Sequence, residues 1–141
     1  MDLRTARDVA GVRARASVGG AALSAVLGVG CGVFAATAPD EARPVLVAAC
    51  VLGLVSAVGC VLVAVANRSL VADPAARAPR SLAVTVVVGV LLAWLATVVG
   101  IAIGTGELAW VVTALGLVVA VLPAVTLALV TVKGPHPAPG A

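Results

Sequence analysis

The sequence predicts an all-α fold: an integral membrane four-helix bundle made of two antiparallel transmembrane hairpins. Composition is the first reason, because 62% of the 141 residues are hydrophobic and only 11% are charged. Soluble domains carry about 45–50% apolar and about 25% charged residues. So few polar groups cannot cover the surface of a small soluble domain. Such high hydrophobicity also excludes an intrinsically disordered chain.

The spacing of the charged residues is the second reason. They divide the chain into four uncharged runs of 24 to 26 residues. A hydrocarbon core of about 30 Å needs about 20 apolar residues in a helix, so each run crosses once. The runs are apolar on all sides, whereas a membrane β-strand alternates between lipid and lumen. The expected spans of this single transmembrane domain are residues 17–38, 45–66, 82–104 and 108–131.

The first span, residues 17–38, has the weakest apolar character. It has few large apolar side chains and contains five glycines, which weaken a helix. Its end, Ala36-Thr37-Ala38, matches the small-x-small pattern of a signal-peptide cleavage site. The run is longer than a signal core of about 7–15 residues, and Pro39 would follow the cut. We therefore expect an uncleaved span that depends on its helical neighbours.

The connections arrange the spans as hairpins. Tight turns at residues 39–44 and 104–106 join the first span to the second and the third to the fourth. Short links force antiparallel neighbours. The third span, with 13 Val, Leu or Ile residues, is the most strongly apolar. The rest of the chain is expected to form a cytoplasmic N-terminal segment, a cytoplasmic loop and a disordered Pro/Gly-rich tail: residues 1–16, 67–81 and 133–141.

Lys and Arg predict the orientation. Eight of the nine basic residues fall on one side of a four-span chain, and Arg43 alone falls on the other. Short cytoplasmic loops are enriched in Lys and Arg, so both termini are expected in the cytoplasm. The net charge of +3 then follows from topology and does not indicate nucleic-acid binding. This basic face, next to the lipid bilayer, is expected to attract anionic headgroups.

Small residues recur at four-residue spacing in every span, which keeps them on one slowly turning helix face. Lipid is as apolar as valine, so close backbone packing through small residues is what holds membrane helices together. Such small-xxx-small packing predicts a compact bundle, self-association or contact with another membrane protein. Ala and Gly are so abundant here that chance also produces such rows. The candidate packing residues are Gly28, Gly32, Gly53, Ala57, Gly100, Gly104, Gly116 and Ala120.

Side chains with catalytic chemistry are scarce. No charged residue lies within a span, and intramembrane ionisable groups are what mark ion pathways and proton relays. The chain is similar in size and span count to small four-span multidrug exporters, which depend on a membrane-embedded Glu in their first helix. Residues 17–38 contain no Glu. A lone histidine, His136, cannot form a metal site, and the three cysteines, which form no CxxC pair, are interpreted as packing residues. We expect no enzyme activity, cofactor or metal.

Trp94 and Pro123 are the candidates for a cavity or a kink. Trp94 falls near the middle of the third span, where it either packs inside the bundle or lines a cavity; packing is the favoured interpretation. Pro123 removes a backbone donor near the middle of the fourth span. Proline is common in membrane helices, so Pro123 alone does not define a site.

These features predict a small non-enzymatic membrane protein that acts as an accessory, scaffold or interaction subunit. Arginine outnumbers lysine eight to one and tyrosine is absent, a bias typical of GC-rich genomes that favours a bacterial inner membrane. The alternative is a small oligomeric transporter or channel for a neutral solute. Its pore would be lined by hydroxyl groups, those of Ser24, Ser56, Thr97, Thr113 and Thr126.

Overall fold

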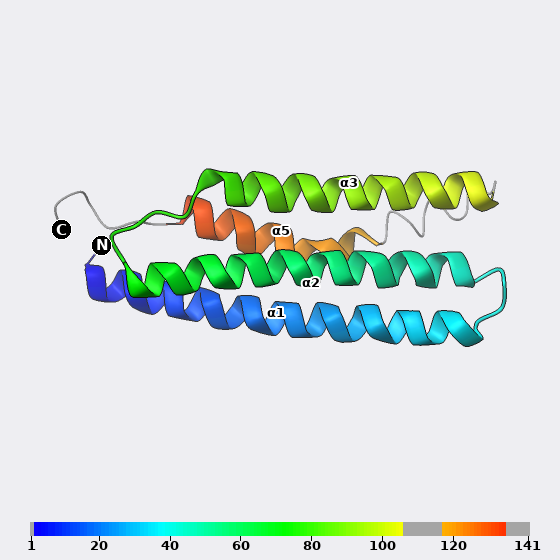
Figure 1. Cartoon of the computed structure of the whole chain (residues 1–141), viewed down its shortest axis with the longest axis horizontal. Helices are drawn as coiled ribbons and strands as arrows, with labels where there is room; N and C mark the ends of the chain where they lie inside the picture. Colours follow the sequence, from blue (N-terminus) through cyan, green and yellow to red (C-terminus); the bar gives the residue numbers. More distant parts are fainter. Residues whose placement is uncertain (1, 106–116, 135–141) are drawn as a thin grey trace.

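The computed structural model describes residues 2–105 and 117–134 of the chain (Figure 1). Within these ranges the protein is all helical and has no strand, which confirms the predicted fold class. Residues 108–116 of the fourth expected span, including the candidate packing residue Gly116, lie outside the described residues. The four described helices are α1 (Leu3–Thr37), α2 (Arg43–Ala72), α3 (Arg80–Thr105) and α5 (Val118–Lys133).

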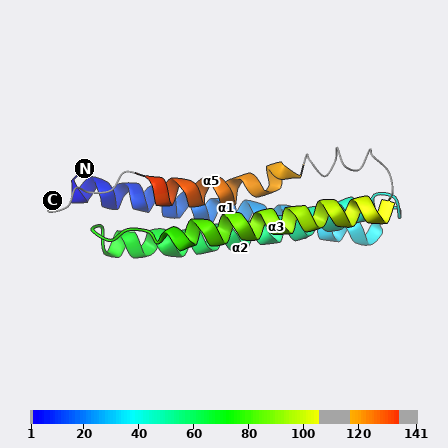
Figure 2. The same ribbon diagram turned by 90° about the horizontal axis from the view of Figure 1, so that it is seen from above.

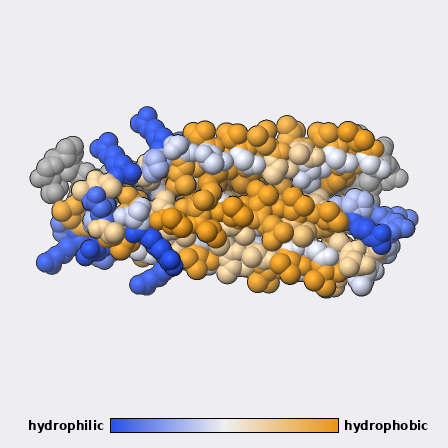
Figure 3. All heavy atoms as spheres, in the orientation of Figure 1, coloured by the Kyte–Doolittle hydropathy of each residue, from blue (hydrophilic) through white to orange (hydrophobic). Residues whose placement is uncertain are grey.

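Three of these helices, α1, α2 and α3, are long and apolar enough to cross a membrane. Their lengths are 35, 30 and 26 residues, and α5 is a shorter apolar helix of 16 residues. Hydrophobic side chains cover the middle of the molecule in Figure 3, and the hydrophilic ones gather at its two ends. This distribution is that of a membrane protein with helical spans.

The helices α1 and α2 continue past the expected spans at the end where α1 begins. Residues 3–16 extend α1, and residues 67–72, expected in a loop, extend α2. Arg7 Nε donates to the Val71 carbonyl oxygen at 3.1 Å across this extension. Beside this bond Ala10 of α1 packs with Leu70 and Ala78. These contacts explain why the two helices stay paired beyond the apolar runs.

Helices that follow one another in the chain run antiparallel, whereas α2 and α5 run parallel to each other, and α1 begins at the end of the bundle where α5 finishes (Figure 1). The most extensive contact joins α1 and α2. The helix α5 lies to one side of α2 and α3 (Figure 2) and also touches α1. Within the described residues α3 meets α2 and α5 but not α1. The bundle is therefore a tight α1–α2 hairpin joined through α2 and α5 to a more peripheral α3.

The hydrophobic core lies between α2, α3 and α5. Its centre is a close meeting of these helices at Gly59 of α2, where a Cβ atom would lie 3.1 Å from Ala124 Cβ and 3.2 Å from Val86 Cγ1. Small residues at this point allow α5 and α3 to approach α2 together. The buried members of the core are Leu52, Cys60, Val63, Val86, Val90, Val121, Ala124 and Ala128.

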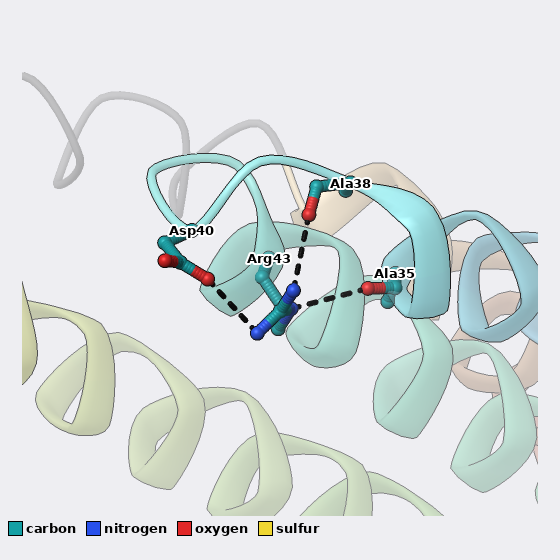
Figure 4. Close-up of polar contacts among 4 residues, drawn as sticks. All are labelled: Ala35, Ala38, Asp40 and Arg43. Carbon is teal, nitrogen blue, oxygen red and sulfur yellow. Dashed lines mark hydrogen bonds and ion pairs between the residues drawn. The ribbon is translucent and has the colours of Figure 1, made fainter.

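Arg43 fixes the turn between α1 and α2 (Figure 4). Its Nε and Nη2 atoms donate to the carbonyl oxygens of Ala35 at 3.3 Å and Ala38 at 3.2 Å. Its Nη1 atom pairs with Asp40 Oδ1 at 2.9 Å. Carbonyls at a helix C-terminus lack helical partners and favour a nearby cation. The single basic residue at this end of the bundle is thus engaged in closing the hairpin.

Candidate functional site

The closest helix contact is made by Gly28 of α1 and Gly53 of α2. A Cβ atom on Gly53 would lie 2.8 Å from Gly28 Cα and 3.0 Å from the Ser24 carbonyl oxygen. A Cβ atom on Gly28 would lie 3.1 Å from both the Cys50 carbonyl oxygen and the Leu54 nitrogen. Every one of these neighbours is a backbone atom, so the two glycines let the backbones touch directly.

Three further candidate packing residues lie elsewhere in the packed bundle. A Cβ atom on Gly32 would lie 3.0 Å from Cys50 Sγ, so this glycine accommodates a cysteine side chain. Ala57 is buried in α2. Ala120 of α5 is half-buried against the hydrophobic core. All three lie where the chain packs on itself.

Two candidate glycines of α3 lie elsewhere. A Cβ atom on Gly100 or Gly104 would have no heavy atom within 4 Å, apart from its own helix turn and chain neighbours. Ala96, one turn before Gly100, is exposed as well. In the described part of the chain, this small-residue row of α3 is therefore not covered by another helix.

Buried hydroxyl groups join α1 to α2 close to the glycine contact. Ser24 Oγ donates to Ser56 Oγ at 3.4 Å, and both side chains are buried. Cys60, one turn from Ser56, is fully buried, and its Sγ atom lies 3.4 Å from the Cβ position of Gly20. A polar bond inside an apolar bundle supplies a specific helix–helix contact.

The remaining hydroxyl groups do not continue a polar line from Ser24 and Ser56. Thr97 is half-buried and donates to the Ala93 carbonyl oxygen at 2.7 Å, within its own helix. Thr126 is exposed and donates to the Leu122 carbonyl oxygen at 2.8 Å. Thr113 lies outside the described residues. The described hydroxyl groups thus serve separate local contacts and do not outline one pore.

Asn67 is a buried polar residue that sequence reasoning missed, because we placed it in the loop. It is fully buried in α2, and its Nδ2 atom donates to the Val63 carbonyl oxygen and to Thr131 Oγ1, both at 2.9 Å. Its Oδ1 atom has no hydrogen-bond partner among the described residues. The bond to Thr131 ties α2 to α5. Asn67 continues the buried stripe of Val63 and Leu70. This helical spacing of apolar residues was the sequence feature that could have predicted a helix through Asn67.

Two apolar hollows open in the half of the bundle near the α1–α2 turn. One, of about 510 Å³, lies between α2 and α3 and is lined mainly by Val47, Val51, Gly100 and Ile101. The other, of about 410 Å³, lies between α1, α2 and α5 and includes Ser24 and Pro123. Trp94 lines neither hollow and is half-buried against the hydrophobic core.

The two hollows are lined mainly by apolar side chains and contain few groups that could react or bind an ion. Asp40 and Arg43, at the rim of the first hollow, are paired with each other. No group of three or more His, Cys, Asp or Glu side chains that could hold a metal occurs in the described ranges. Comparison of the chain with protein-family models, with curated proteins and with solved structures finds no match.

Proposed function

We propose that this chain is a non-enzymatic subunit of a bacterial inner membrane, an accessory or scaffold protein that binds another membrane protein through α3. The observation that carries the proposal is the row Ala96, Gly100 and Gly104, which no other described helix covers. In α1 and α2 the same kind of row makes the closest contact of the bundle at Gly28 and Gly53. Small residues provide packing energy in lipid only when a second helix meets them.

The hollow beside Gly100 supports the same proposal. Its walls are apolar side chains of α2 and α3, and the described part of the chain leaves about 510 Å³ between them. A single apolar helix from a partner, or from a second copy of this chain, matches both the apolar walls and the small-residue edge. A partner helix that approached Gly100 closely would displace lipid from this surface and pack directly against α3.

Purification tests this interface. The tagged chain, extracted gently at native expression level, is expected to bring down a stoichiometric membrane partner, and Gly100→Leu is expected to abolish that recovery. The substitution fits the described part of the chain, where a Cβ atom at Gly100 would meet no atom of a neighbouring helix within 4 Å. Mass spectrometry of the purified material is the measurement.

Ala102→Leu is the matched control for Gly100→Leu. Ala102 is exposed at nearly the same depth, about 200° around the helix from Gly100. We expect it to retain the partner fully. Equal recovery with both variants would contradict the proposed interface.

The orientation is a second part of the proposal, with both chain ends in the cytoplasm. Its support is the group of basic residues at the end of the bundle where α1 begins and α5 finishes. In a variant without the native cysteines, a cysteine at Glu41 is expected to react with a membrane-impermeant thiol reagent in intact cells. A cysteine at Arg77 should react only after lysis. Labelling of both positions, or of position 77 alone, from outside would overturn the orientation.

An oligomeric transporter or channel for a neutral solute is the second candidate, and the hollow between α1, α2 and α5 favours it. This space of about 410 Å³ is mostly apolar, with Ser24 and Pro123 in its wall. A hydroxyl group suits an uncharged solute better than an ion, which requires charged or multiple polar ligands at membrane depth. Recovery of the purified chain as a homo-oligomer without a partner would favour this function and direct flux assays to neutral solutes.

A further inference from the structure

A groove runs over the surface between α1 and α2 near the end of the bundle where α1 begins. It consists of two adjoining hollows of about 290 Å³ and about 170 Å³ that share Val18 and Arg68. The first hollow also includes Arg15, so two guanidinium groups border it. The second is otherwise apolar and is lined by Ala21, Val61, Ala64 and Val65.

Arg15 and Arg68 differ from the other arginines that pack on the bundle. Arg7 donates to the Val71 carbonyl oxygen, and Arg43 closes the α1–α2 turn. The Arg13 guanidinium lies against Gly134, and burial lowers the pKa of this guanidinium below its usual value. The side chains of Arg15 and Arg68, by contrast, are exposed and form no hydrogen bond or ion pair with any other described residue. Their donors therefore remain available to an external anion.

We propose that this groove binds one anionic phospholipid, with its phosphate between Arg15 and Arg68 and one acyl chain along the apolar hollow. The proposal does not depend on a partner protein. Basic pockets between transmembrane helices on the cytoplasmic side are suited to anionic headgroups. Arginine offers a fork of N–H donors that matches the oxygens of a phosphate.

The groove has the direction that a lipid requires. Along α1 the lining passes from Arg15 to Ala21, and along α2 from Arg68 to Val61. Both paths cover about 10 Å toward the middle of the apolar surface. The walls stay open to an acyl chain, because Val18 and Val65 are 46% and 61% exposed.

The local charge also favours a phosphate. No carboxylate lines either hollow. The nearest acidic residue of α1, Asp8, lies two turns or about 10 Å from Arg15 and farther from the apolar surface. Asp73, five residues past Arg68, accepts a hydrogen bond from the Ala75 nitrogen. Neither carboxylate forms an ion pair with Arg15 or Arg68 among the described residues.

Native mass spectrometry of the full chain in detergent tests this site. With dioleoylphosphatidylglycerol as the probe, the chain is expected to retain one lipid in preference to dioleoylphosphatidylcholine. At about 1 kcal/mol for each arginine near the headgroup, the double variant Arg15→Ala/Arg68→Ala is expected to lose about thirtyfold in affinity for the anionic lipid. Both side chains are exposed, so an unchanged helical circular-dichroism spectrum is expected.

Two further variants separate a specific lipid site from general charge and from a free-phosphate site. Arg4→Ala/Arg77→Ala removes two exposed basic residues that line neither hollow. Its affinity for the anionic lipid should stay within about twofold of that of the unaltered chain. Val65→Trp keeps both arginines and fills the apolar hollow, so it should weaken lipid binding as strongly as the double alanine variant. Leu62→Trp, on the same helix but outside the groove, controls for the added indole.

Three results would overturn the proposal. The first is equal retention of the anionic and the zwitterionic lipid by the unaltered chain. The second is equal losses in the two double-alanine variants, which would indicate general attraction to a basic face. The third is unchanged binding in Val65→Trp together with competition by inorganic phosphate, which would indicate an anion site without a lipid.

Discussion

Replacing Gly53 by Ala is expected to be among the most destabilising single substitutions in this chain, costing about 3 kcal/mol. The added Cβ atom would lie 2.8 Å from Gly28 Cα and 3.0 Å from both the Gly28 nitrogen and the Ser24 carbonyl oxygen. Backbone atoms in a helix cannot move aside as a flexible side chain can. The steric clash can be relieved only if α1 and α2 move apart, and these two helices form the most extensive helix pair of the described bundle.

The separation should also weaken the polar bond beside it. Ser24 Oγ and Ser56 Oγ are already 3.4 Å apart, which is long for a hydroxyl–hydroxyl bond. A shift of a few tenths of an ångström would remove it. The free energy of unfolding, measured by titration of the protein with SDS in mixed micelles, should fall in Gly53→Ala by the sum of both effects.

Gly28→Ala and Gly30→Ala complete the series. A Cβ atom on Gly28 approaches its backbone neighbours only to 3.1 Å, so we expect an intermediate loss. A Cβ atom on Gly30 would meet no atom of another described helix within 4 Å, and alanine is the better helix former by about 1 kcal/mol. Gly30→Ala should therefore be neutral or slightly stabilising. Equal stabilities of the Gly53 and Gly30 variants would mean that α1 and α2 do not meet at this point.

The helical fold was predictable because uncharged runs of membrane-spanning length have few structural solutions. In hydrocarbon every backbone polar group must be paired within the chain, and a helix does this locally. The ends of α1 and α2 were not predictable from charge alone. Arg15 and Arg68 mark the edge of the apolar surface but do not end a helix, because the buried residues Ala14 and Leu70 beside them continue the buried face.

The sequence contained a signal for that extension. Ala6, Ala10 and Ala14 recur at four-residue spacing and are all buried, and Ser17 continues the row. This is the small-residue pattern of the spans, carried into a charged segment. Asn67 was missed for the same reason, because a segment judged by its charges was taken to be a loop.

The role of each glycine was beyond sequence reasoning. Gly28 and Gly100 both belong to small-residue rows at four-residue spacing. Among the described residues, however, Gly28 touches a neighbouring helix backbone and Gly100 touches none. A row shows that close approach is allowed on a helix face. Which helix uses that face depends on the packing of the whole bundle, a long-range property that spacing within one helix does not contain.

Replacing Trp94 by Ala is the second substitution for which we expect a large effect, a loss of about 3 kcal/mol of stability. Trp94 is half-buried and packs against the hydrophobic core. It lies on α3, which among the described helices has the least extensive contact with the rest of the bundle. Side chains of a membrane protein are in an apolar medium whether the bundle is intact or separated. The expected loss therefore comes from the packing contacts of the indole and the cavity that its removal leaves.

Leu95→Ala is the matched control for Trp94→Ala, since the next residue of α3 is 52% exposed and contributes little to the core. Its free energy of unfolding in mixed micelles should remain within about 0.5 kcal/mol of the unaltered chain, as for substitutions away from packed regions. Trp94→Phe should fall between the two, because it keeps an aromatic ring of smaller size in the same place. If Trp94→Ala were as mild as Leu95→Ala, the indole would face lipid or an open space, and the attachment of α3 would depend on its buried residues Ala83, Val86, Val90 and Ile101.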